Sequence, residues 1–411
     1  MNIEILTIGT ELLLGFTVDT NGAEIAQLLA PIGVRVVRRT AVTDHADEIR
    51  AALSEALART GAVITTGGLG PTRDDITKKT VADLFGLELE FQESIWQELL
   101  ARYARYGRKP SDSNRCQAEV PEGATVLPNQ RGTAPGLWIE GAPGLVIMLP
   151  GVPIEMRGLM VQEVVPRLGA LAGGSVIRSR TVRTSGIAES ALAELLGNVE
   201  EEIAPLSLAY LPGLDGVDLR VTAWNVSPEQ STGKLESAVR TIHASASRFI
   251  YGEGDADLAE LLLGRARERR ERLAVAESCT GGLLGGRITA IPGSSEVFEG
   301  GIIAYDDAVK TAHLGVDPAL IAAHGAVSEP VCQAMVRGVA TRFNTTLAMA
   351  ITGIAGPGGG SREKPVGLVW FASLADGQVK AQSYVFPGTR KEIRDRAAQA
   401  ALFQLYGLIR A

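Results

Sequence analysis

Ser278 lies in the stretch with the clearest chemical potential, residues 276–282 (AESCTGG). An apolar run at residues 273–276 predicts a strand before it, and the pattern of residues 283–288 predicts a helix after it. The hydroxyl of Ser278 should then stand exposed at a tight turn beside a helix N-terminus, where backbone N–H groups favour negative charge. Ser278 is therefore a candidate nucleophile or anion ligand. The alternative is a helix-capping Ser or Thr followed by packing glycines.

A serine nucleophile needs a base, and Lys310 is the better candidate in this sequence. The chain has four histidines, and none of them lies in a recognisable triad motif. Lys310 follows an apolar run, residues 302–305, which predicts a strand ending at Tyr305, and we expect the lysine on the next helix. A partly buried lysine amine can take the proton of a serine hydroxyl. The alternative is an ordinary solvated lysine on a helix surface.

Two further features of the C-terminal region suit a phosphate-bearing ligand. Residues 352–360 (TGIAGPGGG) follow a predicted strand and offer a glycine-rich cradle for an anion. Arg390 precedes a predicted helix that carries Arg394 and Arg396, and its guanidinium can grip a phosphate in a fork geometry. The alternative is a surface arginine near a helix start.

Near the N-terminus, residues 65–78 (TTGGLGPTRDDITK) follow a predicted strand. Glycines let the backbone approach a phosphate, and the adjacent carboxylates of Asp74 and Asp75 are hard oxygen ligands that suit Mg²⁺. Lys78 lies one helical turn beyond Asp74 and can meet a phosphate. The alternative is that the two aspartates cap the next helix and complement its dipole.

The alternation of strands and helices over residues 1–170 predicts an α/β domain with a mostly parallel sheet covered on both faces. Ligands of such sheets bind beyond the carboxyl ends of the strands. The same edge should receive residues 9–15 (GTELLLG), with Glu11, and residues 149–156 (LPGVPIEM), in which Glu155 begins a helix. The strands are predicted at residues 4–8, 34–40, 62–66 and 145–149, and the helices at residues 20–30, 46–58 and 77–85.

The later part of the chain divides into a small α+β module and a second α/β unit. Arginines 178, 180 and 183 alternate along one strand of the module, where contact with RNA is one interpretation and a solvated face is the alternative. The module has predicted strands at 178–184, 206–211 and 217–223 and helices at 189–196 and 235–249. The last unit has a predicted helix at 258–272 and strands at 273–276, 302–305, 347–351, 367–373 and 379–386. The expected ranges are 1–172 for the first domain, 175–250 for the module, 251–256 for a polar glycine-rich linker and 257–411 for the last domain.

Composition narrows the class of protein. A net charge of −7 argues against a dedicated nucleic-acid binder. The three cysteines are far apart and form no metal-type spacing, which favours a reduced, cytoplasmic setting. The N-terminal residues read as a strand and not as a signal peptide, and no apolar run is long enough to span a bilayer.

Taken together, the motifs resemble the CinA family, the competence/damage-inducible protein A proteins. The resemblance covers essentially the whole chain in family order, including the middle module and the linker. The motifs that carry it are residues 9–15, 65–78, 150–156, 276–282, 325–330 (GAVSEP), 353–360 and 364–367 (KPVG).

The resemblance implies that the chain has three parts with different folds and functions. The N-terminal part is similar to molybdopterin-binding domains, with a three-layer α/β/α fold, and is associated in the family with metal-dependent ADP-ribose hydrolysis. The middle part looks like a KH-type module that need not bind RNA. The C-terminal part resembles amidases that convert nicotinamide mononucleotide to nicotinate mononucleotide and ammonia.

The resemblance also implies roles for individual residues. Ser278 corresponds to the nucleophile and Lys310 to its base, while Tyr305, Thr352 and Arg390 line the nucleotide site. Many amidase relatives have Asp where this chain has Thr389, which leaves the role of Arg390 against that of Arg394 open. Substrate contacts are expected from Thr280, Gly281, Gly282, Gly353 and Arg390 in the last domain, and from Gly67, Gly68, Gly70, Lys78 and Gly151 in the first.

The resulting expectation is a cytoplasmic, homodimeric, bifunctional enzyme of pyridine-nucleotide salvage. Backbone N–H groups of residues 280–282 or 353–355 are expected to hold the oxyanion. The N-terminal activity should need a divalent metal, Mg²⁺, Mn²⁺ or Co²⁺, whereas the amidase should need none. The metal ligands are expected to be Asp74, Asp75, Glu11 and Glu155. Two alternatives remain: an N-terminal domain that only binds a pterin or nucleotide, and an interaction protein in DNA uptake or repair.

Overall fold

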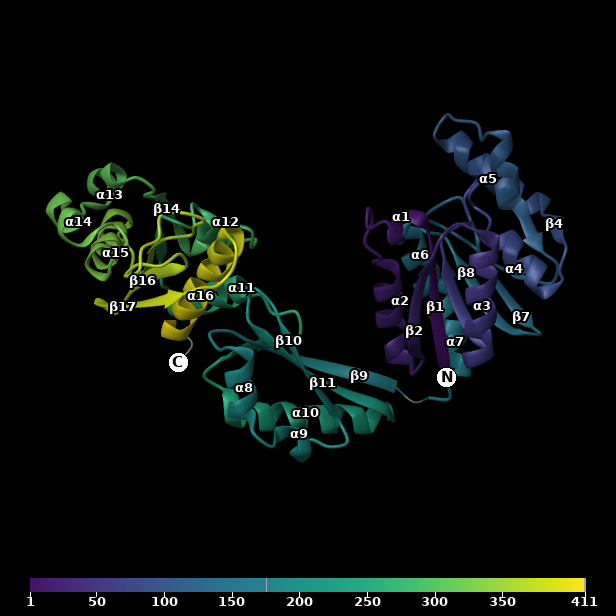
Figure 1. Ribbon diagram of the computed structural model, residues 1–411, viewed down its shortest axis with the longest axis horizontal. Coiled ribbons are helices and arrows are strands. Elements are labelled where there is room, and N and C mark those ends of the chain that lie inside the picture. Colours follow the sequence, from purple (N-terminus) through teal and green to yellow (C-terminus); the bar gives the residue numbers. More distant parts are fainter. Residues whose placement is uncertain (175, 410–411) are drawn as a thin grey trace. The chain divides into compact units, whose positions relative to one another are not determined.

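The computed structural model describes residues 1–174 and 176–409 (Figure 1). By its internal contacts the chain divides into two compact units. One unit comprises Met1–Arg178 with Ala223–Lys234, and the other comprises Ser179–Thr222 with the chain from Leu235 onward. Each unit is organised around β-sheets.

The N-terminal sheet has the strand order β2-β1-β3-β8-β7-β6. The first four strands pair in parallel, as the sequence predicts, while β7 and β6 pair antiparallel at one edge. The antiparallel edge was not predicted, and its cause is local: only two residues join β7 to β8, which is enough for a hairpin but far too short for a parallel crossover. The strands are β1 Asn2–Ile8, β2 Arg35–Val42, β3 Ala62–Thr66, β6 Thr125–Leu127, β7 Gly136–Gly141 and β8 Gly144–Leu149, with a separate pair formed by β4 Leu89–Phe91 and β5 Glu119–Pro121.

Helices cover both faces of this sheet and produce the predicted α/β/α layers. On one face, Ile25 and Leu29 of α2 and Leu159 of α6 pack in one hydrophobic core cluster. On the other, Ile49 of α3 and Val81 of α4 pack in a second cluster. The helices are α1 Thr10–Leu13, α2 Asn21–Leu29, α3 Ala46–Thr60, α4 Thr77–Phe85, α5 Glu93–Arg105, α6 Pro153–Leu159 and α7 Val165–Leu171.

The middle module is a four-stranded sheet in the order β10-β11-β9-β12. Its last strand corrects the sequence analysis, because residues 251–253 of the predicted linker belong to β12, which pairs antiparallel with β9. The side chains of Ile250 and Tyr251 are buried there, a tertiary burial that the local polar, glycine-rich composition does not reveal. The elements are β9 Val176–Thr184, α8 Glu189–Leu196, α9 Val199–Glu202, β10 Ser207–Pro212, β11 Val217–Val226, α10 Pro228–Ala246 and β12 Ile250–Glu253.

The C-terminal sheet has the order β14-β13-β15-β16-β17. Strands β14, β13 and β15 are parallel, and β16 and β17 continue the sheet antiparallel. Helices α11 and α16 pack on one face, and α15 packs on the other. The strands are β13 Leu273–Glu277, β14 Phe298–Ile303, β15 Leu347–Gly353, β16 Leu368–Ala375 and β17 Gln378–Val385. The helices are α11 Leu258–Arg269, α12 Leu283–Thr289, α13 Asp307–Leu314, α14 Pro318–His324, α15 Glu329–Phe343 and α16 Arg390–Ile409.

Two predicted boundaries in this domain shift. Helix α11 ends at Arg269, short of the predicted Arg272, because Arg270 adopts a left-handed backbone conformation with φ 57°. Strand β14 begins at Phe298 and ends at Ile303, so Tyr305 lies just beyond the strand. The carboxyl ends of β13, β14 and β15 meet at one edge of the sheet. Ser278 and Tyr305 follow the ends of β13 and β14, and Thr352 is the residue of β15 just before its end at Gly353.

Candidate active sites

The turn that carries Ser278 joins β13 to α12, as predicted. Glu277, the last residue of β13, is only 2% exposed, and its carboxylate accepts hydrogen bonds from the backbone N–H groups of Gly282 (3.0 Å), Leu284 (3.1 Å) and Gly285 (2.8 Å). The start of α12 is thus already neutralised by a carboxylate of the chain. This corrects the expectation that this helix start stabilises negative charge on the ligand, and it removes the Gly282 N–H from the oxyanion donors.

Ser278 itself lies at the carboxyl edge of the sheet and is buried, which corrects the prediction that it stands exposed. Its backbone N–H donates to the carbonyl of Ile351 at 2.9 Å, which places it beside the end of β15. The Ser278 Oγ forms no hydrogen bond with any residue that the structure describes. The side chain is therefore neither a helix cap nor part of a structural network, and the capping alternative does not hold.

Lys310 lies on α13 and is 1% exposed, which rules out the solvated alternative. Its Nζ donates to the carbonyl of Tyr305 at 3.2 Å and to Oδ1 of Asp307 at 3.2 Å. The N–H of Ala304 donates to the carbonyl of Glu277 at 2.7 Å, so the segment held by Lys310 runs beside the residue that precedes Ser278. The lysine and the serine therefore belong to the same edge, although no hydrogen bond joins them.

Two arginines of α16 bind different parts of this edge. Arg390 donates from Nη2 to the hydroxyl of Tyr305 at 2.8 Å and from Nη1 to the carbonyl of Gly356 at 2.7 Å. Arg394 donates from Nη2 to the carbonyl of Thr280 at 2.7 Å. Arg390 thus links the two predicted ligand loops and remains exposed, whereas Arg394 holds the nucleophile turn.

Two threonine hydroxyls in the site differ in their hydrogen bonding. Thr352 is fully buried, and its Oγ1 donates to the carbonyl of Ala326 at 2.9 Å. The Oγ1 of Thr280 is also buried but has no hydrogen-bond partner. Thr280 thus has an unused polar group in the nucleophile turn, whereas the hydroxyl of Thr352 already serves the loop at residue 326.

Glycines of the C-terminal site allow close packing of its loops. A Cβ at Gly353 would lie 2.8 Å from the carbonyl oxygen of Leu368, and one at Gly356, where φ is 76°, would lie 2.6 Å from a methyl carbon of Val366. At the turn, Gly281 and Gly282 have φ of 59° and 91°. The backbone conformation of the loops at this edge therefore requires glycine, independently of any ligand that they bind.

Cys279, next to Ser278, does not compete as a nucleophile. Burial raises the pKa of its thiol to about 12, so the thiol stays protonated at neutral pH.

In the N-terminal domain, Asn21 joins three loops at the predicted edge. Its Nδ2 donates to Oγ1 of Thr66 at 3.0 Å, at the end of β3, and to the carbonyl of Gly151 at 2.8 Å, after β8. Its buried Oδ1 has no partner. The sequence places Asn21 just after the loop at residues 9–15 but does not predict these contacts, because nothing local distinguishes it from a polar residue at a helix start.

The glycines of the 65–78 loop permit a tight backbone. Gly67 has φ 106°, and a Cβ there would lie 2.2 Å from the carbonyl oxygen of Ile8. A Cβ at Gly68 would lie 2.0 Å from Oγ1 of Thr77, and one at Gly70 would lie 2.4 Å from Oδ2 of Asp75. Gly67 and Gly68, which both have positive φ, are thus required by contacts within the protein itself, whereas the carboxylate of Asp75 can move to admit a Cβ at Gly70.

The four predicted metal ligands do not converge. In the described part of the chain, no group of three or more His, Cys, Asp or Glu side chains is placed to hold a metal ion. Glu11 and Asp74 are exposed, whereas Asp75 accepts hydrogen bonds from the N–H (2.8 Å) and hydroxyl of Thr72. Neither aspartate caps α4.

Glu155 and Lys78 serve structural contacts at this edge. Glu155 accepts a hydrogen bond from Nδ2 of Asn129 at 2.6 Å, and burial raises the pKa of its carboxyl. Lys78 is mostly buried, which lowers its pKa, and its ammonium donates to the carbonyl of Cys116. The prediction that Lys78 meets a phosphate is therefore not supported by its position, since its amine holds the segment before β5.

The arginines of β9 are engaged and do not form a free basic stripe. Arg180 pairs with Glu253 at 3.7 Å, and Arg183 pairs with Asp218 at 3.1 Å. Arg178 donates to the carbonyl of residue 228 at 3.3 Å.

The described helices include none with the length and apolarity needed to cross a lipid bilayer.

Comparison with known proteins gives matches along the chain. Residues 4–170 match the family model "Probable molybdopterin binding domain", residues 179–252 match "Damage-inducible protein CinA KH domain", and residues 255–409 match "CinA C-terminal domain". A "CinA-like protein" of Gemmatimonas aurantiaca is 54% identical over 98% of this chain and 96% of its own length. A "CinA-like protein" of Chlorobaculum tepidum is 41% identical over 98% and 97%.

Two solved structures that are similar to part of this chain can be compared with it. A CinA superfamily protein of Escherichia coli is 32% identical, with 37% of this chain and 90% of that chain covered and a TM-score of 0.36. The protein CinA of Thermoplasma acidophilum is 35% identical, with 41% and 99% covered and a TM-score of 0.37.

Proposed function

The chain belongs to the CinA family, and from that premise we propose that it is a bifunctional enzyme of pyridine-nucleotide salvage. Its C-terminal domain would hydrolyse the carboxamide of nicotinamide mononucleotide to nicotinate mononucleotide and ammonia. Its molybdopterin-binding-like domain would hydrolyse ADP-ribose to AMP and ribose 5-phosphate. The observation that best supports the amidase is the fully buried Lys310, which is held by the segment running beside the strand end that bears Ser278.

In the proposed amidase reaction, Ser278 Oγ attacks the amide carbonyl carbon while Lys310 takes its proton. The tetrahedral intermediate then expels ammonia, which leaves with the proton that Lys310 returns. Water hydrolyses the resulting ester and restores the serine. As a neutral amine, Lys310 has two N–H donors and one lone pair, so it can keep its hydrogen bonds to Tyr305 and Asp307 while the lone pair takes the serine proton.

Binding of the nucleotide is assigned to the loops that Arg390 links. The exposed guanidinium of Arg390 can receive the phosphate, and the hydroxyl of Tyr305 already lies at 2.8 Å from it. Thr280 has a buried hydroxyl without a partner, which a polar group of the substrate would satisfy. Arg394 acts as a positioning residue, because it binds the carbonyl of Thr280.

A divalent metal would supply Lewis acidity and positive charge for ADP-ribose hydrolysis. The exposed carboxylates of Glu11 and Asp74 are the oxygen donors that fit it, since Mg²⁺ often takes one or two carboxylates and completes its shell with water and phosphate oxygens. Asp75 and Glu155 would orient these loops through Thr72 and Asn129.

A binding-only N-terminal domain is the second candidate. The lack of three converging metal-ligating side chains among the described residues favours it, as does the name of the family model that this region matches. Under this alternative, the domain binds ADP-ribose or a pterin without turnover.

Ser278→Ala tests the amidase directly. The variant should release no ammonia from nicotinamide mononucleotide beyond the uncatalysed rate and should keep the stability of the parent, because Oγ forms no hydrogen bond with the described residues. Ser383→Ala, on the exposed part of β17, is the matched control and should be fully active. Near-parental turnover by Ser278→Ala would disprove the covalent mechanism.

A further inference from the structure

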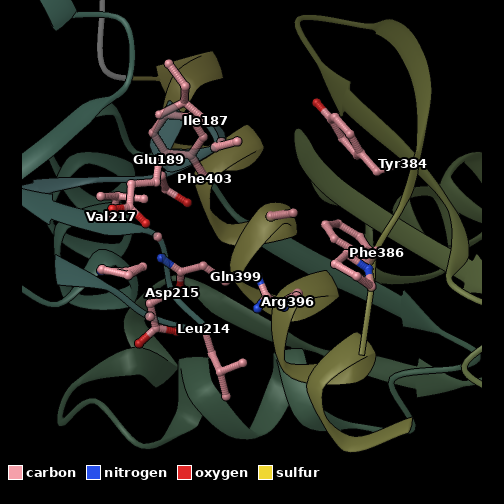
Figure 2. A pocket seen from close by; sticks show the side chains of 18 of the residues that line it. Ile187, Glu189, Leu214, Asp215, Val217, Tyr384, Phe386, Arg396, Gln399 and Phe403 are labelled. Carbon is pink, nitrogen blue, oxygen red and sulfur yellow. The ribbon is translucent and has the colours of Figure 1, made fainter. Parts of the chain in front are cut away.

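A cavity of about 440 Å³ lies within the second compact unit, away from the Ser278 turn. Its walls come from the turns at residues 185–189 and 212–217, from the end of β17 and from the middle of α16 (Figure 2). The volume is in the range of small-molecule sites. Nothing in the proposed amidase or pyrophosphatase reaction uses this cavity.

Three nitrogen donors without partners belong to residues that line the cavity. They are Nε of Arg396, Nε2 of Gln399 and Nε2 of Gln404, each of them buried. Residues 396, 399, 403 and 404 are spaced three, seven and eight positions along one helix, so they share one face of α16. Buried donors are normally paired, and three unpaired ones on one face indicate a group that accepts hydrogen bonds.

A hydrogen bond from Arg287 fixes the orientation of the Gln399 side-chain amide. The residue is 2% exposed, and its Oε1 accepts a hydrogen bond from Nη1 of Arg287 at 2.7 Å. With the oxygen engaged by Arg287, the amide nitrogen is the end of the side chain that lacks a partner. Figure 2 shows Gln399 and Arg396 on the helix between Asp215 and Phe386.

The side chains that line the cavity favour a ligand with an anionic group, a planar ring and hydroxyl groups. Arg396 forms no ion pair with the residues that the structure describes, so its guanidinium is available to an anion. Phe403, Tyr384 and Phe386 supply aromatic walls for a planar ring. Two carboxylates also line the cavity: Asp215, paired with Arg287 at 3.5 Å, and Glu189, which can accept from hydroxyl groups.

We propose that this cavity binds a nucleoside monophosphate. The phosphate is received by Arg396, the planar base lies against the aromatic walls with its acceptor atoms toward the two glutamine amides, and the ribose hydroxyls donate to Glu189 and Asp215. The proposal does not rest on the deamidation of nicotinamide mononucleotide.

Hydrogen exchange of the full chain with AMP as the probe tests the site, because it localises binding even if AMP also occupies other sites. AMP should protect residues 212–217 and 396–404 in the parent protein. Arg396→Gln and the near-isosteric Gln404→Glu should each raise the AMP concentration for half-protection at least tenfold. Lys391→Gln, on α16 outside the cavity, should leave it unchanged. Adenosine, which lacks the phosphate, should protect these segments at least tenfold more weakly.

Several outcomes would overturn the proposal. These are protection that is absent from both segments in the parent protein, protection that is equal in the parent and in both cavity variants, and equal protection by adenosine and AMP. Hydrogen exchange of β15, a buried core strand, provides the control for folding of each variant. Arg396→Gln removes a positive charge from the cavity and Gln404→Glu adds a negative one, so a folding defect in one variant leaves the other informative.

Discussion

At the scale of single residues, two neighbours in the nucleophile turn have different roles: Glu277 stabilises the turn, and Ser278 is the proposed nucleophile. Glu277 binds three backbone N–H groups and is almost fully buried, whereas the hydroxyl of Ser278 binds none of the described groups. Glu277 has a recognisable signal in hindsight, because it is an acidic residue that ends an otherwise apolar strand. The sequence does not reveal its partners, since they are backbone groups of the following turn.

Replacement of Lys310 tests the base. Lys310→Met keeps the length of the buried side chain and removes the amine, so kcat for deamidation should fall by about 100-fold or more, with KM for nicotinamide mononucleotide much less affected. Steady-state ammonia release measures both constants. Lys380→Met, at an exposed position of β17, serves as the control. A loss of less than a few-fold would assign the base elsewhere.

Replacement of Glu277 tests the support of the turn. Glu277→Gln leaves an amide facing three N–H donors, so the free energy of unfolding should fall by about 2 kcal/mol, and deamidation should fall with it. Urea unfolding provides the measurement. Glu296→Gln removes an exposed partner of Arg267 and should cost no more than about 0.5 kcal/mol. Equal stability of the two variants would show that the Glu277 carboxylate contributes no net support.

At the scale of elements, the alternation of patterns predicts most strands and helices of both α/β sheets, and the shared strand edge gathers the predicted loops. The strand β3 and the helix α4 have their predicted bounds. Other features depend on distant partners: β12 within the predicted linker is set by pairing with β9, and the engagement of Lys78 is set by the carbonyl of Cys116. Local spacing carries no information on either.

The loops of the N-terminal edge lead to a prediction on metal. EDTA should stop hydrolysis of ADP-ribose and leave deamidation intact, because the serine and lysine chemistry needs no metal. Asp74→Asn should raise the Mg²⁺ concentration for half-maximal hydrolysis at least about tenfold. Asp83→Asn, exposed on α4, should not change it. Equal loss of both activities with EDTA contradicts this division, and absence of hydrolysis at any metal concentration supports the binding-only alternative.

At the scale of the whole molecule, the contacts unite much of the middle module with the C-terminal domain. Tyr251 of β12 belongs to the same hydrophobic core cluster as α11 and α16. Phe403 of α16 lies against Gly186, where an added Cβ would approach its ring to 3.0 Å. The sequence predicts a last domain that begins at 257, but a cut there removes core contacts.

Two fragments measure the contribution of these contacts. Fragments 179–411 and 255–411 should both deamidate nicotinamide mononucleotide and lack ADP-ribose hydrolysis, because each retains every predicted amidase residue. The shorter one should melt about 5 °C lower or more, since it loses buried Tyr251 and uncovers Phe403. Thermal unfolding followed by circular dichroism gives the comparison. Equal melting temperatures, or a soluble fragment without deamidation, contradict the expectation.

Helix α16 touches the amidase edge through Arg390 and Arg394 and lines the second cavity from Arg396 to Gln404. Each residue added to an α-helix rotates everything beyond it by about 100°. In a library of single-codon insertions, variants with an extra residue within 390–404 should therefore be depleted by selection for activity, while insertions in the exposed turn at residues 361–363 should persist. Along this helix, selection would therefore tolerate substitutions of amino acids far better than changes in the number of residues.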